Sequence, residues 1–152
     1  MALTDETIST LIEAIAKIYE SDLTELVLKR LDSFGYEAKE DDVFVIGYSV
    51  QKVENNIKND CNITEIPEGL TNTAVDMACG EILDTLYRTG KLDVGSIGLD
   101  GAIASVSLGD ATVSFDNTAT DNSGTFTALI NALKDSGRGD FACHKFSTSE
   151  FC

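Results

Sequence analysis

The sequence predicts a mainly α-helical protein, a helical bundle of about four to five helices with one inserted β-hairpin. Apolar residues recur at intervals of three and four through most of the 152 residues, which is the helical period. A single Pro leaves long stretches free for helix. One segment, residues 104–115, instead alternates apolar and polar residues around a Gly-Asp pair, which is the pattern of a hairpin. The length predicts one domain over residues 1–137, followed by a C-terminal tail over residues 138–152.

Two helices are predicted in the first part of the chain. The first spans residues 4–19, because Thr4 is a good N-cap residue and acidic residues follow it in the first turn. The second follows Ser21 or Asp22 and stops at Gly35, a residue type that commonly ends helices. The apolar faces of these helices comprise Ile8, Leu11, Ile12, Ile15 and Ile18 in the first, and Leu23, Leu26, Val27, Leu31 and Phe34 in the second.

Two further helices follow, and the second of them is expected to be the centre of the core. The third opens at Asp41 or Asp42 and runs to about Asn59, and its narrow apolar seam is typical of helices packed side by side. The fourth spans residues 70–87 and is apolar almost all round, which indicates a buried helix. A charge placed at Ala78, within this fourth helix, should therefore be the most damaging single change to folding.

The last helix begins at Asn122 or Ser123 and closes at Gly137. Its apolar residues at helical spacing are Phe126, Leu129, Ile130 and Leu133. Gly80 lies inside the fourth helix, where glycine costs about 1 kcal/mol relative to alanine. We interpret Gly80 as the point where a neighbouring element approaches closely.

The hairpin at residues 104–115 raises the question of what its strands contact. Gly109-Asp110 suits a two-residue turn, and the resulting register gives the hairpin one apolar face and one face of Ser and Thr. A lone two-stranded hairpin is marginally stable, and neither Lys nor Pro blunts its edges. We therefore predict pairing between copies, with a small flap on a monomer as the alternative. The predicted oligomer interface is Val106, Leu108, Gly109, Asp110, Val113 and Phe115.

The formal net charge is −15, from 26 acidic and 11 basic residues. Such a surface repels phosphate, which argues against sequence-specific nucleic-acid binding and against binding to anionic membranes. No apolar run approaches the length needed to span a bilayer, and no secretory signal is expected. Without an export signal, the four cysteines are expected to be reduced thiols. Cys61 and Cys79 are expected in the core, and Cys143 and Cys152 are interpreted as incidental.

We do not expect an enzyme, a metal site or a cofactor. The one His, His144, lies in the tail without a second His or close Cys pairs at ligand spacing. Asp41-Asp42 fits a helix cap better than a pair of catalytic carboxylates. Asp100, Asp110 and Asp116 fit turns better than a cation site, and the tripeptide at 138–140 is too short to indicate adhesion.

Two motifs and their order resemble a known family. Ile57, Cys61, Asn62, Ile66 and Pro67 precede the fourth helix, and Val106, Gly109, Asp110, Val113, Ser114 and Phe115 form the hairpin that follows it. Over about residues 40–136, this arrangement resembles the head–tail connector proteins (adaptor or head-completion proteins) of tailed bacteriophages and prophages.

The resemblance implies a structural virion protein of the phage neck, made in the host cytoplasm. Its copies would form a homo-oligomeric ring, typically of twelve subunits, which extends the DNA channel below the portal protein and joins the capsid to the next neck or tail-completion protein. DNA would pass through without specific binding. By this resemblance, the hairpin would contact a neighbouring subunit of the ring. The tail becomes a portal-docking segment through Phe141, Phe146 and Phe151, although folding of the tail back onto its own domain is an equal alternative.

The net charge of −15 also fits a different class of protein, a DNA mimic. An acidic helical protein can mimic DNA and occupy the basic groove of a nuclease or a repressor. Such an inhibitor would be a monomer or a dimer, with its acidic residues in a regular double row and without a use for the hairpin edge.

Overall fold

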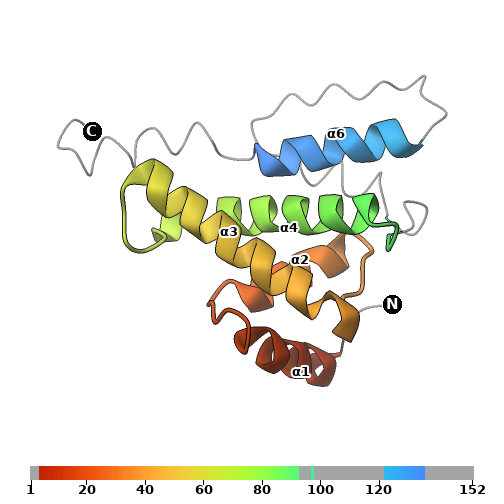
Figure 1. Ribbon diagram of the computed structural model, residues 1–152, viewed down its shortest axis with the longest axis horizontal. Helices are drawn as coiled ribbons and strands as arrows, with labels where there is room; N and C mark the ends of the chain where they lie inside the picture. Colours follow the sequence, from red (N-terminus) through yellow and green to blue (C-terminus); the bar gives the residue numbers. More distant parts are fainter. Residues whose placement is uncertain (1–3, 93–96, 98–121, 136–152) are drawn as a thin grey trace.

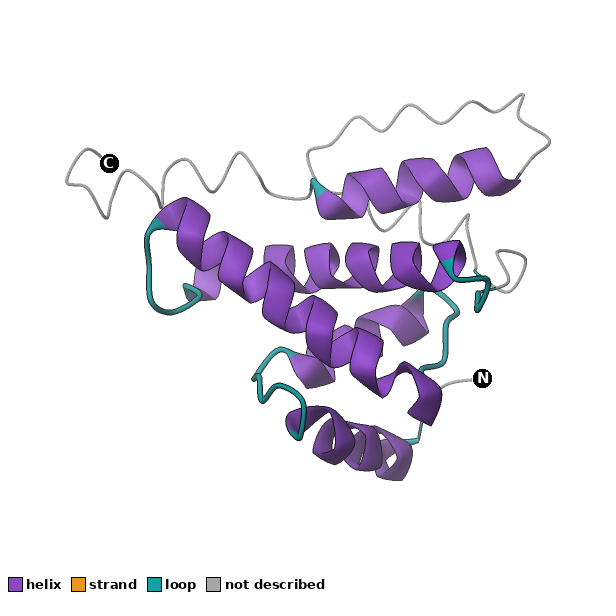
Figure 2. Ribbon diagram, viewed as in Figure 1, coloured by secondary structure: helices purple, strands orange, loops and turns teal. Residues whose placement is uncertain are grey.

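The computed structural model describes residues 4–92, 97 and 122–135, and this part of the chain consists of helices joined by short turns (Figure 1, Figure 2). The mainly helical prediction is confirmed for these residues. The predicted hairpin at 104–115 and the tail at 138–152 lie outside them and stay predictions. The described α-helices are α1 (Asp5–Ala16), α2 (Thr24–Ser33), α3 (Val43–Cys61), α4 (Thr71–Arg88) and α6 (Asn122–Lys134), with 3-10 turns η1 (Glu40–Asp42) and η2 (Glu68–Leu70).

Helix α4 lies at the centre of the bundle, as predicted. Figure 1 shows α6 along one side of it, α2 on the other side and α3 crossing it obliquely, with α1 beyond α2 and α3. Ala78, Ile82 and Leu83 of α4 are inaccessible to solvent. The core therefore forms around a helix that has neighbours on several sides, which is why its sequence is apolar nearly all round.

Helices α4 and α6 run antiparallel and in close contact. Gly80 faces Leu133 near the end of α6, and the ring of Tyr87 packs on Phe126 near its start, with ring centroids 5.1 Å apart. A Cβ atom at Gly80 would lie only 3.0 Å from Cβ of Leu133 and 3.1 Å from the backbone nitrogen of Lys134. The predicted close approach at Gly80 is thus confirmed, and α6 is the neighbour.

Polar side chains fix two of the helix starts. Thr4 caps α1 by accepting a hydrogen bond from the backbone N–H of Thr7 at 3.2 Å. Asp42 is buried at the start of α3, where it accepts hydrogen bonds from the Lys39 backbone N–H at 3.0 Å and from the Tyr36 hydroxyl at 2.5 Å. Asp42 occupies the N-cap position of α3, as predicted, but its carboxylate bonds back to Lys39 at the start of η1 and makes no capping hydrogen bond to α3 itself.

The structure differs from the predicted helices 1 and 2 at their junction. Helix α1 ends at Ala16 because the chain turns there, and the N–H groups of Ile18 and Tyr19 both bond to the carbonyl of Ile15. Ile18, which was predicted on the buried face, is therefore 40% exposed.

Helix α2 begins at Thr24, later than predicted. The Ser21 hydroxyl oxygen accepts the N–H of Leu23 one turn before the helix starts, so it shapes the loop rather than capping α2. The buried stripe of α2 runs through Val27, Leu28 and Leu31. Leu26 lies beside this stripe and is 44% exposed, which corrects its predicted burial.

Candidate functional site

The first of the two motifs, residues 57–67, forms the corner between α3 and α4. Ile57 and Cys61 are fully buried at the end of α3. Asn62 then adopts a left-handed conformation with φ 54°, and the N–H of Ile63 bonds back to the carbonyl of Lys58 at 3.0 Å. Asn is one of the few residue types that tolerates this conformation, so it ends the helix at low cost.

The second half of this motif leads the chain into α4. Pro67 accepts the N–H of Leu70 at 2.9 Å, which closes η2, and Leu70 is fully buried. Ile66 is partly buried and packs against the core. The motif residues thus set how α3 and α4 meet, and their role in the described part of the chain is architectural.

The candidate interaction site is an exposed aromatic patch formed by Ile18, Phe44 and Tyr48. Phe44 is 64% exposed and Tyr48 is 55% exposed, and their rings stack with centroids 5.9 Å apart and planes 22° apart. A Cβ built at Gly47, between the two aromatics on α3, would lie 3.0 Å from Ile18, so Ile18 covers the neighbouring surface of that helix. Phe44 and Tyr48 thus form an exposed apolar area on the N-terminal half of α3, and Ile18 lies against the same helix at Gly47.

The aromatic patch sits on a firmly anchored helix. Ile46 and Val50 on the opposite side of α3 are almost completely buried, at 0% and 1% exposure. The Asp42–Tyr36 hydrogen bond holds the helix start directly before Phe44. A partner would therefore meet a preorganised surface, which lowers the entropy lost on binding.

Sequence reasoning missed this patch because it followed the buried seam of the helix. The available signal was two aromatic residues, Phe44 and Tyr48, spaced by four positions and lying off that seam. Such a pair stacks on the helix surface and has no core role.

A second surface feature is a groove of about 480 Å³ between α2 and α4. Leu26 and Val75 line it together with Arg30 and Asp76. Arg30 donates a hydrogen bond from Nε to Asp76 Oδ1 at 2.9 Å, and its guanidinium lies 4.5 Å from the ring centroid of Phe34. Lys29, the other cation that lines the groove, pairs with Glu25 at 2.9 Å, so both cations are already engaged by their own chain.

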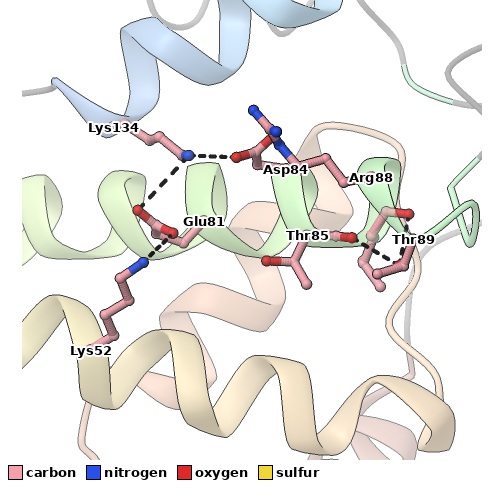
Figure 3. Close-up of polar contacts among 8 residues, drawn as sticks. Lys52, Glu81, Asp84, Thr85, Arg88, Thr89 and Lys134 are labelled. Atoms are coloured by element: carbon pink, nitrogen blue, oxygen red, sulfur yellow. Dashed lines mark hydrogen bonds and ion pairs between the residues drawn. The ribbon is translucent and has the colours of Figure 1, made fainter.

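Charged residues join α3, α4 and α6 (Figure 3). Lys134 of α6 lies 2.5 Å from Asp84 and 4.0 Å from Glu81 on α4. Glu81 also pairs with Lys52 of α3 at 3.1 Å, and Asp84 pairs with Arg88 at 2.8 Å. Partial burial works to raise the pKa of Asp84, but the hydrogen bonds from Lys134 and Arg88 outweigh it and hold that pKa below its usual value.

Chemistry-bearing groups are dispersed in the described part of the chain. Three or more metal-ligating side chains do not come together anywhere within residues 4–92, 97 and 122–135. Cys61 and Cys79 are buried, as predicted, and burial raises the pKa of Cys79. Within the same residues, every helix is too short or too polar to cross a membrane.

The predicted interface residues Val106, Leu108, Gly109, Asp110, Val113 and Phe115 lie outside the described residues, as do Phe141, Phe146 and Phe151. Comparisons of the chain with family models, with curated proteins and with solved structures find no match. The fold and the patch define a helical protein with an exposed aromatic surface, and its particular role is a matter for proposal.

Proposed function

We propose that this protein is a head–tail connector of a tailed bacteriophage or prophage. Its copies assemble into a ring below the portal, and the aromatic patch of Ile18, Phe44 and Tyr48 is one of the surfaces through which a copy contacts its neighbour. The role is structural rather than enzymatic. The exposed patch is the observation that supports a role in protein–protein interaction. The resemblance of the two motifs to those of connector proteins suggests that the assembly is a connector ring.

Aromatic side chains are the usual anchors of protein interfaces, where they contribute large contact areas at low entropic cost. Phe44 and Tyr48 already restrict each other by stacking, so they lose little freedom when a partner covers them. Their apolar contact would also have to overcome the repulsion between copies that each carry a net charge of −15. A strong apolar anchor is what such an assembly requires.

A ring also requires two different surfaces on each copy, because its contacts are head-to-tail. The predicted hairpin at 104–115 supplies one of them in this proposal, and the aromatic patch supplies the other. The tail at 138–152 is then left for the portal protein. The resulting structure would occupy the virion neck and let DNA pass along an acidic wall that does not bind phosphate.

The test is a double substitution, Phe44→Ser with Tyr48→Ser, compared with Gln51→Ser and Asn55→Ser on exposed positions of the same helix. Each pair is solvent-exposed, so both variants should keep the wild-type melting temperature. Light scattering and electron microscopy, with and without a purified portal protein, report assembly. We expect rings from the wild type and the control, and monomers from the aromatic variant.

Rings of wild-type size from the aromatic variant would rule out the patch as a subunit contact. Failure of the wild type to assemble even on a portal, combined with inhibition of a nuclease or repressor, would favour the DNA-mimic class instead. The two results are separable. The aromatic variant tests one contact surface, whereas the wild type tests whether the protein is a connector at all.

A further inference from the structure

The linker between α1 and α2 takes its position from side-chain contacts. Helix α1 ends at Ala16 and α2 begins at Thr24, and residues 17–23 between them contain no helix. A repeating pattern of backbone hydrogen bonds does not fix such a segment, so the groups that it contacts decide where it lies. Leu23 is buried at one end of the linker, whereas Ile18 near the other end is 40% exposed. The position of Ile18 therefore depends largely on contacts at the surface of the neighbouring helix.

Two of the linker contacts lie on one face of α3. Ile18 covers Gly47, where a Cβ atom would lie 3.0 Å from Cγ2 and 3.2 Å from Cβ of Ile18. The Ser21 hydroxyl donates a hydrogen bond to Glu54, with 2.5 Å between Ser21 Oγ and Glu54 Oε2. Gly47 and Glu54 are seven residues apart, which is about two helical turns, so they share a face of α3 at a spacing of about 10 Å. The linker is thus attached to this face at two points.

Glu54 is a buried carboxylate that the linker surrounds with hydroxyl groups. Only 8% of the residue is exposed. It accepts a second hydrogen bond from the Tyr19 hydroxyl, and burial together with the Glu54 charge raises the pKa of Tyr19. Lys58, one turn further along α3, lies 3.9 Å from Glu54 Oε1. Burying a carboxylate costs free energy unless polar groups satisfy it, and here the linker supplies two of the donors.

The Ser21 hydroxyl also holds the linker from its other side. Its oxygen accepts a hydrogen bond from the backbone N–H of Leu23 at 3.1 Å, and Leu23 is 7% exposed. At the α1 end, the N–H groups of Ile18 and Tyr19 both bond to the carbonyl of Ile15. The contacts with Glu54 therefore hold the middle of the linker, between its attachment to α1 and its entry into the core.

We propose that Glu54 is a positioning residue for the aromatic patch. By holding Tyr19 and Ser21, it keeps the adjacent Ile18 on α3 next to the two aromatic rings. This inference deepens the proposed function and rests on it, because the surface that Glu54 positions is the proposed contact between copies. A contact surface that is already ordered before binding loses less entropy when a partner covers it.

The first experiment measures the linker in the unassembled protein by NMR. Glu54→Gln keeps the shape of the side chain but has one acceptor oxygen in place of two and no charge. We expect the nuclear Overhauser effect between an Ile18 methyl group and the Gly47 α protons to disappear, and the Leu23 amide to exchange at least about tenfold faster. The pKa of Tyr19, which burial and the Glu54 charge both raise, should move toward its ordinary value. Unchanged amide exchange at Val50 would show that α3 itself stays intact.

Glu25→Gln is the matched control. Glu25 also pairs with a lysine four residues further on, Lys29, but it is exposed on α2. Lys58→Gln is a second control, since it removes the ion pair of Glu54 and leaves the hydroxyl hydrogen bonds. Both controls should keep the wild-type Overhauser effect. Ser21→Ala removes one donor without altering the carboxylate, so it should weaken that effect even if Glu54→Gln does not fold. An unchanged Overhauser effect in Ser21→Ala and in any folded Glu54→Gln would overturn the inference.

The second experiment tests whether Glu54 acts through Ile18. Assembly on a purified portal is measured for Ile18→Ala, for Glu54→Gln and for the double variant. Each single substitution should weaken assembly about tenfold. The double variant should be no weaker than the weaker of the two single variants, because residues that act through one contact have non-additive effects.

Losses that multiply in the double variant, or rings of wild-type affinity from Glu54→Gln, would overturn the positioning role and leave the connector proposal intact. Failure of the wild type to form rings on a portal would instead overturn the connector proposal. The NMR measurements would then still decide whether Glu54 positions Ile18, because they use the unassembled protein.

Discussion

Replacing Gly80 by alanine tests the contact between α4 and α6 directly, because two effects of known size oppose each other there. Alanine is favoured over glycine within a helix by about 1 kcal/mol. The new Cβ would lie 3.0 Å from Cβ of Leu133 and 3.1 Å from the backbone nitrogen of Lys134, which is tighter than ordinary van der Waals contact. Overpacking of this kind costs about 1–3 kcal/mol. Because one of the two atoms is backbone, α6 would have to shift as a unit, and we expect a net loss of about 1 kcal/mol.

Gly124 provides the matched control for this substitution. It also lies in a helix, α6, but it is exposed and a Cβ there would have no atom within 4 Å. Gly124→Ala should therefore raise the free energy of unfolding by up to about 1 kcal/mol, through helix propensity alone.

Thermal unfolding followed by circular dichroism reports both variants, and 1 kcal/mol corresponds to about 2–4 °C for a chain of this size. The two melting temperatures should move in opposite directions. An increase for Gly80→Ala equal to that for Gly124→Ala would show that α6 does not approach α4 as described.

Three further predictions concern the core and its charges. Tyr36→Phe removes a hydrogen bond to the buried Asp42 carboxylate and should cost about 1.5–3 kcal/mol in urea unfolding, whereas Tyr48→Phe on the surface should cost almost nothing. The folded-state pKa of Asp84 is lowered, so its contribution to stability is present above about pH 4 and is lost as the pH falls through the folded-state pKa. The melting temperature of Asp84→Asn, measured as a function of pH, should therefore fall less at acid pH than that of the wild type. Ala78→Asp buries an unpaired charge in the centre of α4 and should abolish the folded circular dichroism spectrum at neutral pH.

Most of the helices could be predicted from the sequence, because burial of one helix face requires apolar residues at the helical spacing. The helix predicted over residues 70–87 agrees with α4 within one residue at each end, and Gly80 correctly indicates a close contact with a neighbouring element. The prediction worked where several physical requirements agree, namely spacing, capping and packing. It was wrong at Ile18 and Leu26, because the spacing of apolar residues continues past the point where the chain leaves the helix or turns away from the core.

The candidate site was much less accessible to sequence reasoning. The aromatic patch depends on which residues of α3 the rest of the fold leaves uncovered, and on Ile18 reaching it from another segment. The ion pairs between Lys134, Glu81 and Asp84 depend on the offset between α4 and α6. Neither relation is encoded locally, since both arise from how separate helices cross.

The distribution of the basic residues bears on how this protein meets its partners. In the described part of the chain, cations lie against carboxylates at Lys29, Arg30, Lys52, Lys58, Arg88 and Lys134. These six cations are engaged by carboxylates and the chain carries a net charge of −15, so the described surface is mainly acidic around the aromatic patch. Copies of such a protein would repel one another over distances that salt screens, whereas salt would not weaken the apolar contacts proposed for Phe44 and Tyr48.

Salt should therefore distinguish the proposed ring from the DNA-mimic class. Raising the ionic strength from about 0.05 M to 0.5 M shortens the screening length from above 10 Å to below it, so association between like-charged copies should strengthen. A complex between an acidic mimic and a basic groove depends on opposite charges and should weaken over the same range. Sedimentation velocity at the two salt concentrations measures the change. Dissociation of the wild-type assembly at high salt would contradict an association driven by the aromatic patch.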